Sequence, residues 1–333
     1  MSGCQKKGFP LSVTHFLNPD PKMTQQIRIG TRGSRLAQTQ TELVIAALRK
    51  AHPALSVEVV TIQTSGDWKP ADGEQRLPED KGGKGQFAKE IEEALLADRI
   101  DCGVHSLKDM PAFLPEGLVI EHVLPGEDPR DVFISSHCKS WRELPQGAVV
   151  GTSSLRRQAF LLSKRPDLKV VTLRGNVNTR LEKMKAGQVD ATFLALAGLK
   201  RLGLENEATE ILDPVDFVPA CGQGVIGIEI RSHNDRIRKL LDAIHDRQTG
   251  LRATAERRVL EILDGSCHTP VGVYASLKSP KMTLHAMAAE PDGSKFYEEK
   301  IEGLAQSTEH VLNLAETLGQ RLKAKVPSAL LRR

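Results

Sequence analysis

Two adjacent arginines, Arg156 and Arg157, follow a polar turn in the stretch GTSSLRRQAF and begin a predicted helix. The first turn of a helix presents unpaired N–H groups and partial positive charge, which favour acidic side chains at that position. Two cations in this turn therefore need a nearby anion. Because the guanidinium fork binds carboxylates and phosphates through two parallel hydrogen bonds, the pair indicates an anion of one of these kinds.

Cations and hydroxyl groups also follow other predicted strands, at the point where each strand ends. In open α/β sheets the loops after the carboxyl ends of the strands share one crevice, where ligands bind. For a single arginine, a solvated surface position is the ordinary interpretation. Several cations in one crevice, however, would repel one another unless a ligand with several carboxylates or phosphates joins them. The residues at these exits are Arg32, Ser34, Ser106, Lys108, Asp109, Ser154, Arg156, Arg157, Arg174, Arg180 and Arg201.

Two further side chains could take part in chemistry. Asp109 is a lone carboxylate beside Lys108, and cationic neighbours would keep it ionised, able to stabilise positive charge or transfer a proton. A structural salt bridge or a turn residue is the alternative interpretation. Cys267 lies in the polar turn DGSCHTPVG, where an accessible thiolate would be a good nucleophile.

Other ligand motifs are weaker. The chain contains no G-x-x-x-x-G-K-[ST] sequence, so a P-loop is not supported. GQGVIG at residues 222–227 matches the dinucleotide fingerprint, but VIGIEI continues as a strand where the fingerprint requires a helix. GGKG at residues 82–85 lies in a Gly-, Pro- and charge-rich loop and indicates either flexibility or a position near the ligand. The pairs His137-Cys138 and Cys267-His268 are isolated, and we expect no metal site.

Composition excludes several classes of protein. The 333 residues carry a net charge of +4 and only 4% aromatic side chains, which is unlike a general nucleic-acid binder. The five cysteines are scattered without a C-x-x-C pair, which is typical of a reducing cytoplasm. No apolar run is long enough to span a membrane, and residues 1–26 lack the apolar region of a signal peptide. We therefore expect a cytoplasmic protein with a poorly ordered N-terminal extension.

From Ile27 onward, predicted strands alternate with amphipathic helices, the pattern of α/β sheets. The first helix should bury Leu36, Leu43, Val44, Ala47 and Leu48 on one face. A second α/β unit begins near residue 131, and its stretch NVNTRLEKMKAG predicts a helix that ends at Gly187. After about residue 245 the pattern changes to a small α+β domain, in which a Pro-Asp-Gly turn joins two strands. The predicted strands lie at residues 27–31, 57–66, 101–106, 117–124, 147–154, 168–173, 190–198, 270–277 and 281–303.

Seven motifs follow one another along the chain: RIGTRGSRLA, GGKGQFAKEIEEALL, VHSLKDMP, GTSSLRRQ, LRGNVNTRL, GQGVIGIE and GSCHTPVG. In sequence and order they resemble the motifs of the porphobilinogen deaminase (hydroxymethylbilane synthase) family. The resemblance runs from about Ile27 to the final helix. Ser266 and Val225 depart from residues common in the family, but neither change removes a charged or nucleophilic group.

The resemblance implies a three-domain fold. Two doubly wound α/β lobes resemble type II periplasmic binding proteins, and the chain crosses between them twice. A small C-terminal α+β domain bears the cofactor cysteine. The boundaries that we predict are an extension over residues 1–26, lobe 1 over 27–125 and 222–243, lobe 2 over 128–219, and the third domain over 246–333.

The resemblance also implies a transferase of tetrapyrrole (porphyrin and heme) biosynthesis. It condenses four porphobilinogen molecules head to tail, releases ammonia, and hydrolyses the chain to hydroxymethylbilane. A dipyrromethane cofactor is linked to the cysteine at position 267 through a thioether. Each pyrrole carries an acetate and a propionate, which supplies the polyanion that the arginines require. We also expect a monomer that binds no nucleic acid and no membrane.

Matched position by position, the motifs imply a role for each site residue. Asp109 is the catalytic carboxylate, which stabilises the positively charged pyrrole nitrogen. The cofactor positions are Cys267, Lys108, Ser106, Ser154, Arg156 and Arg157. The substrate positions are Arg32, Ser34, Gln40, Arg174, Arg180 and Arg201, and the loop covering the site contributes Lys84 and Phe87. The alternative is a non-catalytic, two-lobed anion-binding or sensor protein, which would share the lobes and the arginines but would need neither Asp109 nor Cys267.

Overall fold

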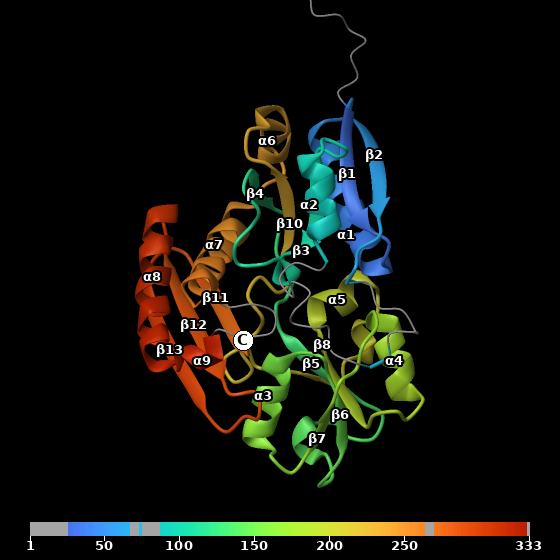
Figure 1. Cartoon of the computed structure of the whole chain (residues 1–333), viewed down its shortest axis with the longest axis vertical. Coiled ribbons are helices and arrows are strands. Elements are labelled where there is room, and N and C mark those ends of the chain that lie inside the picture. The colour runs from blue at the N-terminus through green and yellow to red at the C-terminus, as the bar shows by residue number, and fades with distance from the viewer. Residues whose placement is uncertain (1–25, 67–72, 75–86, 264–269, 332–333) are drawn as a thin grey trace, which may run out of the picture.

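The computed structural model describes residues 26–66, 73–74, 87–263 and 270–331. Within them the chain forms two five-stranded sheets and one three-stranded sheet. Figure 1 shows the first sheet with its helices in the upper part of the view, the second sheet below it, and the third sheet beside both. We call these three parts lobe 1, lobe 2 and the third domain. This arrangement confirms the predicted fold class of two α/β lobes with a small α+β domain.

Lobe 1 is built on the strand order β2-β1-β3-β10-β4. Strands β1, β2 and β3 are parallel, whereas β10 returns from lobe 2 and lies antiparallel between β3 and β4. Fully buried Ile27, Ile29, Ile228 and Ile230 form the centre of its core. The elements are β1 (Gln26–Arg32), α1 (Arg35–Ala51), β2 (Ser56–Ile62), α2 (Lys89–Leu96), β3 (Cys102–Ser106), the 3₁₀ helix η2 (Leu107–Asp109), β4 (Leu118–Val123), β10 (Ile226–Arg231) and α6 (Asp235–Asp242).

Helix α1 shows where the predicted amphipathic face was wrong. Its buried stripe passes through Ala37, Val44 and Leu48 and also includes the polar side chains Gln40 and Thr41. Leu43, predicted to be buried, is 44% exposed. It lies one residue, or about 100°, around the helix from Val44 and therefore outside the stripe. Of its two polar members, Gln40 contacts Ser106 at the end of β3, and Thr41 donates to Thr31 of β1 at 2.8 Å.

Lobe 2 repeats the same design with the order β7-β6-β8-β5-β9. Here β5, which enters from lobe 1, is the strand that lies antiparallel to β8 and β9. Its core contains the stacked rings of Phe160, Phe193 and Phe217. The elements are β5 (Asp131–Ser135), the 3₁₀ helix η3 (Trp141–Glu143), β6 (Val149–Gly151), α3 (Leu155–Lys164), β7 (Lys169–Val171), α4 (Val177–Lys185), β8 (Ala191–Ala195), α5 (Leu196–Arg201), the 3₁₀ helix η4 (Glu205–Glu207) and β9 (Glu210–Ile211).

Helix α4 follows its predicted sequence signals. The Asn176 side chain accepts a hydrogen bond from Thr179 N and caps the start of the helix. Gly187, predicted to end it, has φ of +73° and donates its N–H to Met184 O at 3.0 Å. This left-handed conformation favours glycine at the end of a helix.

Two chain segments cross between the lobes, residues 124–131 and 212–226, and we call them the first and second crossings. They touch where Glu127 N donates to Gly224 O at 3.1 Å. An added Cβ at Gly224 would lie 2.4 Å from Glu127 O, so only glycine permits this approach. The motif at residues 222–227 therefore leads into strand β10, as the sequence predicts, and not into a helix.

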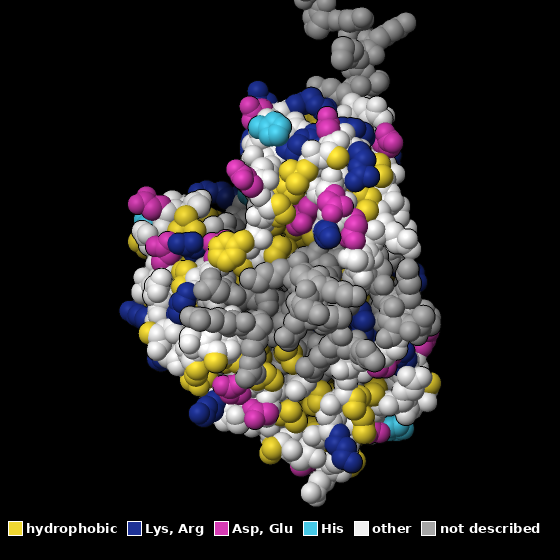
Figure 2. Space-filling view, in the orientation of Figure 1, with side chains coloured by type: hydrophobic (Ala, Val, Ile, Leu, Met, Phe, Trp, Pro, Cys, Tyr) yellow, Lys and Arg dark blue, Asp and Glu magenta, His cyan; other side chains and the backbone are white. Residues whose placement is uncertain are grey.

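The third domain packs a three-stranded antiparallel sheet, in the order β11-β12-β13, against two long helices. Met287 and Ala289 of β12 also belong to the core of lobe 2. On the face drawn in Figure 2, the described Lys and Arg side chains lie dispersed among acidic and apolar ones. The elements are α7 (Arg247–Ile262), β11 (Val271–Lys278), β12 (Lys281–Ala289), β13 (Phe296–Leu304), α8 (Thr308–Lys325) and α9 (Ser328–Leu331).

Candidate active site

A small cavity of about 60 Å³ lies at the carboxyl end of strands β1 and β3 in lobe 1. Six of the predicted site residues line it: Arg32, Ser34, Gln40, Phe87, Ser106 and Asp109. The Arg32 guanidinium lies over the Phe87 ring, 4.3 Å from its centroid, which is a cation–π contact. Gln40 Nε2 donates to Ser106 Oγ at 2.8 Å and joins α1 to the end of β3. The sheet edge therefore gathers these side chains as the sequence predicts.

Helix starts provide two of the predicted hydroxyl groups. Ser34 caps α1 by accepting from Ala37 N, and Ser154 caps α3 by accepting from Arg157 N, both at 3.4 Å. A serine in this position satisfies an N–H that the helix cannot bond internally. Helix capping is therefore a structural reason for serine at both positions.

Arg156 and Arg157 find their nearest anion within the chain. Asp131, fully buried at the start of β5, accepts from Arg156 Nη2 at 2.6 Å and from Arg157 Nη2 at 2.7 Å. The other arms donate to the backbone carbonyls of Val218 and Phe193, each at 2.7 Å. The expectation that only a ligand balances this pair was therefore incomplete.

The arginine pair nevertheless keeps positive charge and a hydrogen-bond donor that Asp131 does not satisfy. Asp131 supplies one negative charge to two guanidinium groups. Burial opposes the ionised form of Asp131, but the attraction of the two arginines outweighs it and lowers its pKa to about 2. The buried Nε of Arg156 has no hydrogen-bond partner. One positive charge of this cluster therefore stays uncompensated by Asp131.

Lys108 and Asp109 bring lobe 1 into the same electrostatic environment. Both are half-buried in η2, and the pKa of Lys108 falls to about 8. Burial is the main cause, and the positive charges of Arg157 and Arg156 add to it, while Asp109 opposes the fall. The ammonium of lobe 1 and the arginines of lobe 2 thus lie close enough to repel one another.

Arg180 and Arg174 extend this group of cations on lobe 2. The pKa of Arg180 falls to about 10 through burial and the nearby charge of Arg157, whereas Asp109 acts to raise it. Its Nε donates to Gly175 O at 2.8 Å. Arg174 is 9% exposed. The catalytic candidate Asp109 and the predicted substrate cation Arg180 therefore interact across the two lobes.

Arg201 lies at the crossings. Its Nη2 donates to Gly224 O at 2.6 Å, and burial lowers its pKa to about 10. The structure thus places this predicted substrate residue against the second crossing, at the end of α5.

Two predicted residues, Cys267 and Lys84, lie outside the described residues. The strand that follows Cys267 along the chain is anchored beside the arginine pair. Val273 N of β11 donates to Pro219 O at 3.0 Å, next to the Val218 carbonyl that Arg156 binds. Among the residues that the structure describes, no group of three or more His, Cys, Asp or Glu side chains is arranged to hold a metal ion.

Three acidic or amide residues of the site were missed. They are Asp131, Gln223 and Glu74, whose carboxylate accepts from Arg174 N at 2.7 Å and pairs with Lys183. Asp131 was noted only as the start of lobe 2, and Gln223 only as part of a glycine motif. A signal for Asp131 existed in the adjacent arginines, since two cations at a helix start require an acid somewhere in the fold. No short-range pattern pointed to Glu74.

The comparisons with known proteins agree with the resemblance. The family model described as "Porphobilinogen deaminase, dipyromethane cofactor binding domain" matches residues 27–239, and "Porphobilinogen deaminase, C-terminal domain" matches residues 250–326. A solved structure of the methionine-binding protein MetQ superposes with a TM-score of 0.42 at 16% identity, covering 67% of this chain and 91% of that chain.

Two curated relatives are both named porphobilinogen deaminase. The protein of Nitrobacter winogradskyi is 51% identical over 277 residues, covering 83% of this chain and 86% of the relative. That of Paracoccus denitrificans is 48% identical over 309 residues, covering 92% of this chain and 97% of the relative. The chain belongs to the porphobilinogen deaminase family.

Proposed function

We propose that this protein is a hydroxymethylbilane synthase, which condenses four porphobilinogen molecules head to tail with loss of ammonia. One observation carries the proposal. A single described carboxylate, Asp109, lines the cavity at the end of β3 and interacts with cations of both lobes, including Arg180. Porphobilinogen bears two carboxylates and one aminomethyl group, so it needs cations to bind it and one anion at the reacting ring.

The cationic group fits a dipyrromethane cofactor. A dipyrromethane carries four carboxylates, and the buried Arg156 Nε has no partner while Lys108 and the arginines repel one another. Lys108, Ser106, Ser154, Arg156 and Arg157 would bind these carboxylates, and Cys267 would hold the group through a thioether. When bound, the cofactor supplies the carbon to which the first substrate is joined.

The residues of lobe 1 would orient the incoming substrate. Arg32, held by Phe87, offers a guanidinium to a substrate carboxylate, and Gln40 and Ser34 offer polar contacts on the same wall of the cavity. Arg174, Arg180 and Arg201 would bind further carboxylates from the side of lobe 2, and Lys84 would come from the preceding loop. Buried guanidinium groups suit this task because few waters compete for their hydrogen bonds.

Asp109 would act on the reacting ring. Its carboxylate can stabilise positive charge on the pyrrole nitrogen while ammonia leaves. It can also hold the proton of that nitrogen.

The alternative, a non-catalytic anion-binding or sensor protein, is not favoured. Both family models match, including that of the C-terminal domain, and the relatives are named as the enzyme. No helix among the described residues has the length and apolar character to span a membrane. A cytoplasmic monomer that binds neither nucleic acid nor membrane completes the proposal.

Intact-mass measurement of the purified protein tests the cofactor assignment. We expect the native chain to carry the added mass of one dipyrromethane, mapped to the peptide containing Cys267, and Cys267→Ala to carry none. Cys138→Ala is the matched control and should keep the added mass, because this half-buried thiol lies in lobe 2. A folded, active protein without added mass would contradict the proposal.

A further inference from the structure

Gln223 lies in the turn where the second crossing re-enters lobe 1. Its side chain is buried, with 3% exposure. Glycines with positive φ, Gly222 at +70° and Gly224 at +86°, flank it on either side. Since these conformations suit glycine, the turn holds the Gln223 side chain in one direction, toward the first crossing.

The Gln223 amide contacts three parts of the site. Its Nε2 donates to Pro129 O at 2.6 Å, which ties the second crossing to the first. The same nitrogen donates to Asp131 Oδ1 at 3.0 Å, the oxygen that also accepts from Arg157. Its Oε1 accepts from Lys108 Nζ at 3.4 Å. One neutral side chain therefore joins the carboxylate of the arginine pair to the lysine beside Asp109.

The polarity of an amide matches both neighbours. The N–H groups of the amide face the anion Asp131, and its carbonyl oxygen faces the cation Lys108. A carboxylate at this position would repel Asp131, and a thioether of similar length would leave three polar groups without this partner. Both Asp109 and Asp131 attract the ammonium of Lys108, and the amide oxygen of Gln223 contacts that ammonium.

We propose that Gln223 is a positioning residue for the reaction, which orients Lys108 beside Asp109 and fixes both relative to the arginine pair of lobe 2. The role of Gln223 in turnover rests on the proposed function. Its contacts with Pro129, Asp131 and Lys108 do not.

The proposal has an electrostatic consequence at Lys108. Among the described residues, the charged groups that act most strongly on this ammonium are Asp109 on its own helix, Arg156 and Arg157 on α3, and Asp131 on β5. Burial and the two arginines already lower the pKa of Lys108 to about 8. Oε1 of Gln223 is a neutral acceptor that favours the protonated form. Its removal lowers the pKa of Lys108 further, toward neutral pH.

The test compares Gln223→Met with Gln158→Met. Gln158 is a matched control, because its amide also donates to a proline carbonyl of another part of the chain, Pro291 O, at 3.0 Å. We measure kcat/KM for porphobilinogen from pH 6 to pH 9.5. In Gln223→Met the alkaline limb of the kcat/KM–pH profile shifts to lower pH by about one pH unit, the size expected for losing a hydrogen bond to a charged group. In Gln158→Met it does not move.

A second readout does not depend on turnover. Acetic anhydride labels deprotonated amines, and peptide mass spectrometry gives the pH at which Lys108 becomes reactive in the holoenzyme. This pH falls in Gln223→Met and rises in Gln223→Glu, because a carboxylate there favours the ammonium. The proposal would be overturned if the pH at which Lys108 becomes reactive were unchanged in both Gln223 variants, or shifted equally in Gln158→Met. Failure of both Gln223 variants to fold would also overturn it. Absent turnover in the native enzyme would contradict the proposed function alone and leave the labelling result valid.

Discussion

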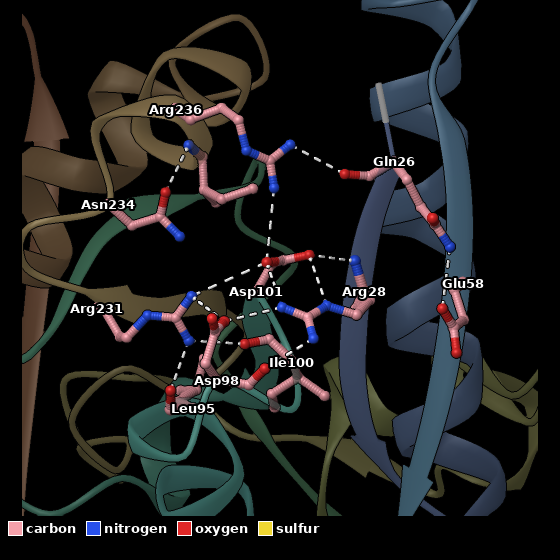
Figure 3. Close-up of polar contacts among 11 residues, drawn as sticks. Gln26, Arg28, Glu58, Leu95, Asp98, Ile100, Asp101, Arg231, Asn234 and Arg236 are labelled. Carbon is pink, nitrogen blue, oxygen red and sulfur yellow. Dashed lines mark hydrogen bonds and ion pairs between the residues drawn. The ribbon is translucent and has the colours of Figure 1, made fainter. Parts of the chain in front are cut away.

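The two ends of the lobe 1 sheet lie in opposite electrostatic surroundings. At the end remote from the cavity, Arg28 bonds to Asp98 and Asp101, Arg231 pairs with Asp98, and Arg236 lies 3.6 Å from Asp101 (Figure 3). Hydrogen bonding to Asp101 is the main cause that raises the pKa of Arg28. At this end each of the three arginines therefore has a carboxylate of the chain as its partner.

At the cavity end the pKa values move in the other direction. Lys108 and Arg180 have lowered pKa values because they are buried beside further cations. The interacting charges described there are six cations and three carboxylates: Lys108, Arg156, Arg157, Arg174, Arg180 and Lys183 with Asp109, Asp131 and Glu74. Arg28 at the remote end and Arg180 at the cavity end thus have pKa shifts of opposite sign, because carboxylates surround the first and burial beside other cations dominates at the second.

The largest expected effect is at the cavity end, in Asp109→Asn. Losing the one described carboxylate that lines the cavity should lower kcat by about 10²- to 10⁴-fold. The melting temperature should change little, because the side chain is half-buried. Asp98→Asn at the other end is the matched control and should keep full activity. A kcat within a factor of three of the native value would contradict the role of Asp109.

Asp131→Ala should reduce stability most. It leaves two buried guanidinium groups without their carboxylate, and we expect the free energy of unfolding to fall by about 3–5 kcal/mol. The same pairing gives a pH signature. Because the folded pKa of Asp131, about 2, lies below its ordinary value of 3.8, its stabilisation is complete above pH 4 and is lost as the pH falls toward 2. Urea denaturation of both proteins at pH 7 and pH 3 measures this, and an equal stability difference at the two pH values would refute it.

Asp101→Ala breaks the remote end instead. Asp101 accepts from Arg28 N at 2.7 Å and from the Arg28 guanidinium, and we expect a loss of about 2–3 kcal/mol in the free energy of unfolding. Turnover per folded molecule should stay at the native level, because the cavity lies at the opposite end of β1. A fall in kcat without a fall in stability would show that the two ends are not independent.

The smallest effect concerns a buried acid without a cation of its own. Glu92 of α2 has its pKa raised to about 7 by burial and by the charge of Glu229. The folded state therefore binds a proton more tightly than the unfolded state, and this stabilisation is lost as the pH rises from 4.5 through 7. Glu92→Gln should be more stable than the native protein by about 1–3 kcal/mol at pH 8 and nearly equal at pH 4.5. Thermal unfolding across this range is the measurement, and parallel curves would exclude the interpretation.

Local patterns predicted most elements and four of the six cavity residues, Arg32, Ser34, Ser106 and Asp109, because strand exits gather at one edge of a sheet whatever the details of packing. Gln40 and Phe87 came from the family resemblance. Gly187 ended its helix as predicted, for the same local reason. Leu43 failed because hydrophobicity alone does not show that polar Gln40 and Thr41 belong to the buried stripe of α1.

The partners of the arginines were beyond local patterns. Asp131 meets Arg156 and Arg157 across 25 and 26 residues, and Gln223 meets Lys108 across 115. Such pairs depend on how the two sheets and the two crossings pack together. A short stretch of sequence does not contain this information. The strongest functional signal was therefore the order of family motifs along the chain.

The return of β10 has a consequence for biosynthesis. Lobe 2 takes all its strands from one continuous stretch of chain, so its sheet can close as soon as that stretch has left the ribosome. In lobe 1, β3 and β4 are joined only through β10. A nascent chain that stops before Ile226 would hold all five strands of the lobe 2 sheet, whereas β4 would not yet be joined to the strands β2, β1 and β3 of lobe 1.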